Sequence, residues 1–149
     1  MKRTHYNSQN ATVMAFGTFD IIHPGHISYL QQAKRLGKKL VVVIARDKTV
    51  ITLKGRKPIF NEQERLAIVG SLGCVDQAIL GDKIHHCKII DRVRPEIVCL
   101  GYDQDITNKK LSEQLERMHI SVHAIVRARA FRGTRYKSSL IKKAFCAST

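Results

Sequence analysis

The sequence predicts an α/β fold, a doubly wound parallel β-sheet with helices on both faces, in a single domain. Apolar, strand-like segments alternate along the chain with segments of helical spacing, which is the order found in parallel sheets. Residues 40–45 form an unbroken apolar run, typical of a parallel strand that is buried on both faces. The 149 residues suffice for one domain with a hydrophobic core and are too few for two.

Five short segments rich in apolar residues are predicted to form the strands of this sheet. They are residues 13–16, 40–45, 75–79, 97–100 and 122–126. The fourth run ends at Gly101-Tyr102-Asp103, a sequence rich in turn-forming residues.

The segments between the strands carry helix signals. After the second strand comes a basic loop, residues 54–58, and Asn61 then begins a helix as its N-cap. Glu64 stands three residues later, as in a capping box, and Gly73 is expected to close this helix.

Two more helices and a C-terminal one complete the pattern. A helix is expected over residues 84–93, ended by Arg94-Pro95. Thr107 caps the next, whose apolar positions have helical spacing: Leu111, Leu115 and Met118. The last helix is expected to begin at residue 138 or 139 and to run to about residue 145.

The net charge is +14, and no acidic residue follows Glu116. Such a basic segment attracts anions: nucleotides, phosphorylated small molecules or nucleic acid. Nucleic-acid binding sites usually interleave stacking aromatic residues with the basic ones, and only Phe131 and Tyr136 lie among the basic residues of this segment. Two polyanionic substrates would explain part of this charge, and the charge alone does not decide between small ligands and nucleic acid.

Residues 1–11 are expected to be a flexible lead-in to a domain that spans residues 12–149. This N-terminal segment is polar and basic and lacks the apolar core of a signal peptide. No apolar run approaches the ~20 residues that cross a bilayer, so we expect a cytoplasmic protein. The four cysteines are widely spaced and form no CxxC pair, which argues against a zinc site and a disulfide framework.

The most informative segment is residues 17–26, Gly-Thr-Phe-Asp-Ile-Ile-His-Pro-Gly-His. The strand at residues 13–16 leads into it. A helix leaves it and stops at Leu36-Gly37, with three apolar residues on one face: Ile27, Leu30 and Ala33. His23 and His26 therefore stand at a helix start, where free backbone N–H groups and the helix dipole favour phosphate.

This segment resembles the HxGH signature of the nucleotidyltransferase superfamily, in its cytidylyltransferase-like branch. Residues 17–26 are similar to those of glycerol-3-phosphate cytidylyltransferases and archaeal FAD synthases (FMN adenylyltransferases). Further stretches resemble the FAD synthases, among them residues 43–47, 56–59, 78–81 and 100–104. The resemblance implies a five-stranded Rossmann-like sheet with strand order 3-2-1-4-5, whose topological switch point lies beside the loops after the first and fourth strands.

The activity that the resemblance implies is nucleotidyl transfer, with AMP passing from ATP to FMN to give FAD and pyrophosphate. Mg²⁺ is implied as an ion carried by the nucleotide, with no protein metal cluster, and a homodimer is expected by analogy. Two alternatives stay open: CTP with glycerol 3-phosphate or ATP with a sugar phosphate as substrates, and a nucleic-acid-binding protein on the same fold.

The resemblance also implies roles for single residues. His23, His26 and Lys54 are the expected catalytic residues. The expected nucleotide-binding residues are Thr18, Phe19, His23, Pro24, Gly25, His26, Asp103, Arg132, Ser138 and Ser139. Residues 132–139 match the cytidylyltransferase sequence RTEGISTT only in part, and their Tyr-Lys-Ser-Ser ending is closer to the FAD synthases.

Two further arginines are candidate contacts for phosphate or for the acceptor. Arg56 belongs to the basic loop, and Arg65 lies one turn into the helix that begins after Asn61. For Arg65, an ion pair on the protein surface is predicted equally well as a contact to the acceptor phosphate.

Overall fold

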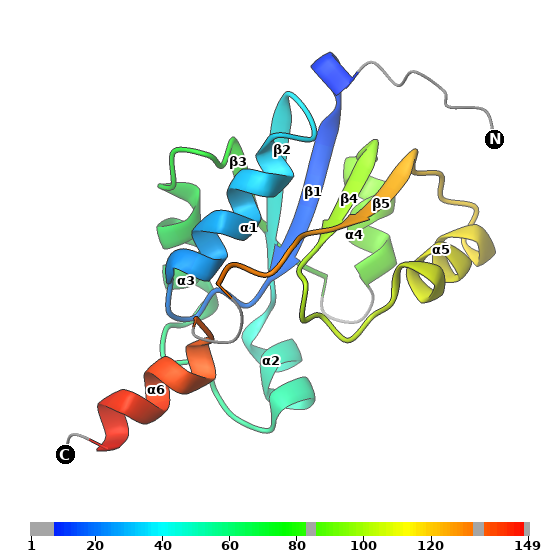
Figure 1. Cartoon of the computed structure of the whole chain (residues 1–149). Coiled ribbons are helices and arrows are strands. Elements are labelled where there is room, and N and C mark those ends of the chain that lie inside the picture. Colours follow the sequence, from blue (N-terminus) through cyan, green and yellow to red (C-terminus); the bar gives the residue numbers. More distant parts are fainter. Residues whose placement is uncertain (1–7, 83–85, 133–135, 148–149) are drawn as a thin grey trace.

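Five parallel strands form the centre of the protein, as its computed structural model shows for residues 8–82, 86–132 and 136–147. The strands are β1 (Thr12–Gly17), β2 (Lys39–Ile44), β3 (Gln77–Leu80), β4 (Ile97–Leu100) and β5 (Ala124–Arg127). Their order in the sheet is β3-β2-β1-β4-β5, which confirms the predicted topology (Figure 1). The order reverses between β1 and β4, where Val13 to Ala15 pair with Ile97 to Cys99.

Helices cover both faces of this sheet (Figure 1). They are α1 (Pro24–Lys34), α2 (Asp47–Lys54), α3 (Glu62–Gly70), α4 (His86–Val93), α5 (Asn108–Arg117) and α6 (Ser138–Ala147). Leu30 of α1 and Val69 of α3 pack in one apolar cluster, whereas Ile90 of α4 and Leu115 of α5 pack in a second. The side chains of successive strand residues point to opposite faces of the sheet. They therefore pack alternately in the first cluster and in the second.

Helix α2 was not predicted: it lies between the second strand and the basic loop, and it takes Lys54 out of that loop. Its β-branched residues lower helix propensity, and Arg46 at its N-cap makes no side-chain capping bond. Tertiary contacts replace these local signals, since the backbone N–H of Asp47 donates to Glu62 at 2.9 Å. Gly55 ends the helix in the left-handed region, with φ of 68°, so Lys54 lies in a helical last turn.

Other predicted boundaries shift by a few residues. The capping box of Asn61 and Glu64 is confirmed, but α3 ends at Gly70, before Gly73. Strands β3 and β5 begin two residues later than expected, and residues 84 and 85 of the fourth helix lie outside the described residues. Ala11, expected in the lead-in, is buried. Its carbonyl accepts from the N–H groups of Lys38 and Lys39, so ordered packing begins before residue 12.

Candidate active site

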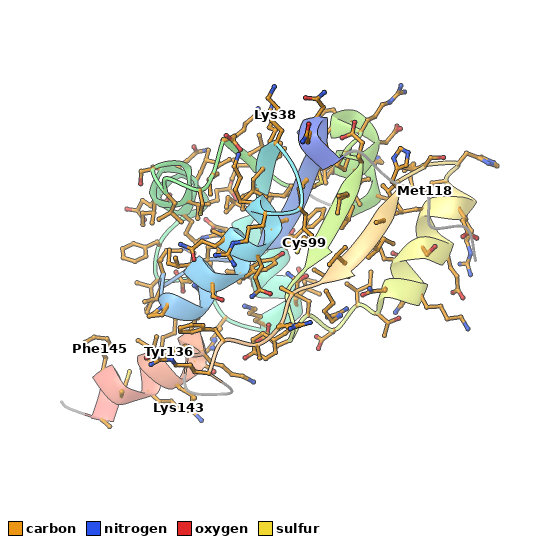
Figure 2. All side chains as sticks on the ribbon, turned by 45° about the horizontal axis from the view of Figure 1, so that its top comes forward. Lys38, Cys99, Met118, Tyr136, Lys143 and Phe145 are labelled. Atoms are coloured by element: carbon orange, nitrogen blue, oxygen red, sulfur yellow. The ribbon has the colours of Figure 1, made fainter. Side chains whose placement is uncertain are left out.

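The loops that follow β1 and β4 are tied together at the switch point by uncharged hydrogen bonds. The hydroxyl of Tyr29 donates to the carbonyl of Cys99 at 2.7 Å and accepts from the N–H of Phe16 at 3.2 Å. The side-chain amide of Gln104 donates to the carbonyl of Phe16 at 2.7 Å and accepts from the N–H of Gly101 at 3.2 Å. Figure 2 shows Cys99 in the middle of the sheet. The two strand ends that frame the site are therefore fixed relative to each other.

His23 is the N-cap of α1, and Pro24 follows as its first residue. The Nδ1 atom of His23 accepts a hydrogen bond from the backbone N–H of Gly25 at 3.1 Å. An accepting Nδ1 carries no proton, so this bond assigns the proton of the neutral ring to Nε2. Nε2–H is then the donor that His23 offers to a ligand.

The ring of His26 stacks on that of His23, with centroids 3.8 Å apart, and meets the edge of the Phe19 ring at 5.2 Å. Burial, then the neighbouring His23, lowers the pKa of His26 to about 3, with Lys54 adding to the shift and the Ile21 carbonyl opposing it. Burial also lowers the pKa of His23, against the opposing charge of Asp103. Both rings are therefore neutral hydrogen-bond donors at physiological pH.

Gly25 keeps this corner open. A Cβ atom at this position would lie 2.9 Å from Cε1 of His23 and 3.2 Å from the carbonyl oxygen of Tyr136. A larger residue would therefore push on the capping histidine or on the segment that leads into α6. The glycine between the histidines lets backbone, histidine and C-terminal segment meet at one point.

Two charged groups of the predicted set lie beside the histidines. The ammonium of Lys54 donates to the hydroxyl of Thr18 at 3.3 Å, which joins the end of α2 to the loop after β1. Partial burial, followed by the cations Lys142 and Arg56, lowers the pKa of Lys54, whereas Asp20 and Asp103 oppose the shift. The Asp103 side chain is exposed beside His23.

Arg65 forms an ion pair, with Asp47, but it does so in the interior of the protein and not on the surface. It is fully buried, and its Nε donates to the carbonyl of Phe60 at 3.0 Å. One terminal nitrogen donates to the carbonyl of Thr18 and the other to Asp47, both at 2.7 Å. The guanidinium is thus committed to protein groups, and it holds the Thr18 loop on α2 and α3.

The remaining predicted residues surround the site more loosely. Arg132 is exposed, has a positive φ of 48° and lies over the ring of Phe131 at 5.5 Å. Ser138 donates weakly to the carbonyl of Ile21 at 3.5 Å, and Ser139 is exposed. Arg56 is exposed but close enough to Lys54 to lower its pKa.

Sequence reasoning did not single out Asp20, although it belongs to the Gly-Thr-Phe-Asp segment. Its carboxylate is only 4% exposed and accepts from the N–H groups of Ile59 and Phe60, each at 2.9 Å. It also forms an ion pair with Lys142 of α6. The place of Asp20 inside the Gly-Thr-Phe-Asp segment was a signal for it, whereas nothing local marked Lys142, which lies 122 residues away.

The described residues contain no group of three or more His, Cys, Asp or Glu side chains that could hold a metal ion. A Mg²⁺ ion that arrives with a triphosphate keeps several waters and needs only one or two carboxylates, so this donor set fits such an ion. Asp20 is occupied by its three donors, and Asp103 is the exposed carboxylate beside His23. None of the helices in the described part of the chain has the length and apolarity to span a membrane.

A parallel sheet of this order, with two neutral histidines at a helix start beside its switch point, defines a Rossmann-like protein of the HxGH class. The cytidylyltransferase-like family model matches residues 14–144. The chain therefore belongs to the cytidylyltransferase-like family, as its motif predicted.

Relatives within this family are FAD synthases. The one from Aciduliprofundum boonei is 49% identical over 113 residues, which cover 76% of this chain and 75% of the relative. The one from Archaeoglobus profundus is 46% identical over 127 residues, covering 85% and 80%. A crystal structure described as a lipopolysaccharide core biosynthesis protein from Thermoplasma volcanium has a TM-score of 0.78 and 45% identity, and the match covers 81% of this chain and 98% of that one.

Proposed function

We propose that this protein is an FMN adenylyltransferase, which transfers AMP from ATP to FMN and releases pyrophosphate. The observation that carries the proposal is the similarity to FAD synthases along most of both chains. The pair of stacked, neutral histidines at the start of α1 supports it, because such a site binds phosphate oxygens through hydrogen bonds.

In the proposed reaction, a phosphate oxygen of FMN attacks the α-phosphorus of ATP, and the bond from that phosphorus to the bridging oxygen of pyrophosphate breaks. A phosphate monoester is mostly dianionic at neutral pH, so the attacking oxygen needs no general base. Positioning and charge stabilisation then supply the acceleration. His23 and His26 donate to the phosphate oxygens, and Lys54 neutralises charge on them.

The other predicted residues take binding roles in this proposal. Thr18 and Phe19 contact the nucleotide with backbone N–H groups, and Asp103 accepts from its ribose. Arg132, Ser138 and Ser139 hold the terminal phosphates, with Arg56 as an additional cation. Mg²⁺ carried by ATP adds charge neutralisation, with Asp103 as the exposed carboxylate near the histidines.

Pyrophosphate release with Mg²⁺ across four substrate pairs tests this function: ATP or CTP, each with FMN or glycerol 3-phosphate. Release with ATP plus FMN alone, and FAD found by chromatography, is the expected result. Release with CTP plus glycerol 3-phosphate alone would move the protein to the cytidylyltransferases. If none of the four pairs releases pyrophosphate, both substrate sets are rejected. Sugar phosphates as acceptors and salt-sensitive nucleic-acid retention would then be tested.

We further propose a cytoplasmic homodimer. The support is α6, which extends away from the sheet and exposes 45% of Leu140 and 72% of Phe145 (Figures 1 and 2). Exposed apolar side chains on a protruding helix favour burial against a second copy. Light scattering after size exclusion checks this, with Phe145→Ser expected to shift the protein toward monomer.

A further inference from the structure

We propose that Lys142 is a positioning residue, whose ion pair with the buried Asp20 seats the start of α6 beside His23 and His26 at the start of α1 and so supports nucleotide binding. The inference rests on the proposed function in one respect, that the ligand bound beside these histidines is a nucleotide. The seating of α6 itself is independent of the substrate.

The Asp20 carboxylate is held in place by groups outside α6, so that it can serve as an anchor for this helix. Its backbone belongs to the loop after β1, and its carboxylate is held from a second side by the N–H groups of Ile59 and Phe60. Burial alone would raise the pKa of Asp20, but Lys142 and the two backbone donors lower it below its usual value. Asp20 is therefore a buried, permanent negative charge, which needs a cation.

Lys142, near the C-terminal end of the sequence, supplies that cation. Its side chain is 19% exposed, and of the four ion pairs found among the described residues only its pair with Asp20 involves α6. No residue of α6 is buried, so apolar packing contributes little to holding this helix within the described chain. The ion pair between Lys142 and the nearly inaccessible Asp20 carboxylate therefore contributes much of the interaction that holds α6 in place.

The start of α6 lies beside the two histidines. The carbonyl of Tyr136 is 3.2 Å from the position of a Cβ on Gly25, and Ser138 reaches the carbonyl of Ile21. Lys142 is also close enough to Lys54 to lower its pKa. The Asp20 charge therefore lets two cations stay near each other at the point where a triphosphate is expected to bind.

The test compares Lys142→Ala with Lys143→Ala, because Lys143 is the next residue of α6 and is exposed (Figure 2). Amide hydrogen exchange of residues 136–147 is measured without nucleotide. Exchange is expected to accelerate about tenfold in Lys142→Ala and to stay within about twofold of wild type in Lys143→Ala. Equal exchange in the two variants would overturn the seating of α6, whatever the protein catalyses.

Steady-state kinetics tests the consequence. Lys142→Ala is expected to raise the KM for ATP about tenfold and to leave the KM for FMN within about twofold, with recovery in Lys142→Arg. In an Asp20→Asn background, Lys142→Ala is expected to add less than about twofold, since the partner is already lost. A full tenfold effect in that background would overturn the pairing and make Lys142 a direct ligand of ATP.

If wild type makes no FAD, the proposed function fails, and the exchange comparison still decides the seating of α6. If wild type makes FAD while Lys142→Ala matches Lys143→Ala in exchange and kinetics, only the positioning role fails.

Discussion

The two sides of the candidate site are held by different forces. On the sheet side, Tyr29 and Gln104 join β1 to the β4 end with uncharged hydrogen bonds in the interior. On the helix side, Lys54 and Lys142 reach the same loop from exposed helices by one long hydrogen bond and one ion pair. The sheet side can therefore fix the histidines before any ligand arrives, whereas the helix side depends on charge and hence on salt and on bound phosphate.

The largest effect is expected from the fixed side. His26→Ala removes a preorganised donor and should lower turnover by about 10²- to 10³-fold with the fold intact. Turnover is measured beside circular dichroism, with His119→Ala as the control, since His119 is an exposed residue just past the end of α5. Normal turnover in folded His26→Ala would remove this residue from the catalytic set.

Tyr29→Phe tests whether the fixed side depends on the hydroxyl. It keeps the ring but leaves the buried carbonyl of Cys99 without this donor. We expect a loss of about 1–3 kcal/mol in the free energy of unfolding, measured by urea denaturation. An unchanged urea midpoint would show that the tie between β1 and β4 does not depend on this bond.

Lys54→Met tests the charged side. Removal of a partly exposed cation should lower kcat/KM for ATP about tenfold, and the loss should shrink as salt rises because salt already screens the wild-type charge. Lys48→Met is the matched control, because Lys48 is an exposed lysine of the same helix. A tenfold loss in both variants would point to net charge as the cause and would exclude a specific contact.

The smallest effect concerns pH. The pKa of His26 is about 3 in the folded protein, below its ordinary value of 6.5, so the folded state resists protonation there. Its contribution to stability is complete above about pH 6.5 and is lost as pH falls toward about 3. Urea midpoints at pH 7.5 and 5 should fall less in His26→Gln than in wild type, and equal falls would contradict a buried neutral ring.

The same contrast explains what the sequence could and could not predict. All five strands and their order follow from apolar runs and the motif resemblance, and β4 has the predicted bounds. Helix α2 was missed because its β-branched residues give a weak helical signal and Glu62 and Arg65 support it from α3. The histidine corner could be predicted because strand, loop and helix start are consecutive in the chain.

The charged side could not be predicted in the same way. Arg65 resembles a surface arginine in sequence, yet it is buried because three acceptors from separate segments surround it. Asp20 and Lys142 carry no local pattern that pairs them, and only the folded chain brings them together. Local patterns therefore predicted that the two histidines stand at a helix start beside the sheet, and long-range charge pairing decides how the surrounding helices are held.

The most direct test of the proposed reaction is the stereochemistry of transfer from ATP that carries a chiral α-thiophosphate. In this reaction His23, His26 and Lys54 stabilise charge, and a phosphate oxygen of FMN attacks the α-phosphorus directly. This mechanism predicts inversion of configuration at phosphorus in the FAD analogue formed. Retention would reveal two successive displacements through an adenylylated protein side chain, and would contradict the role given to His23 and His26.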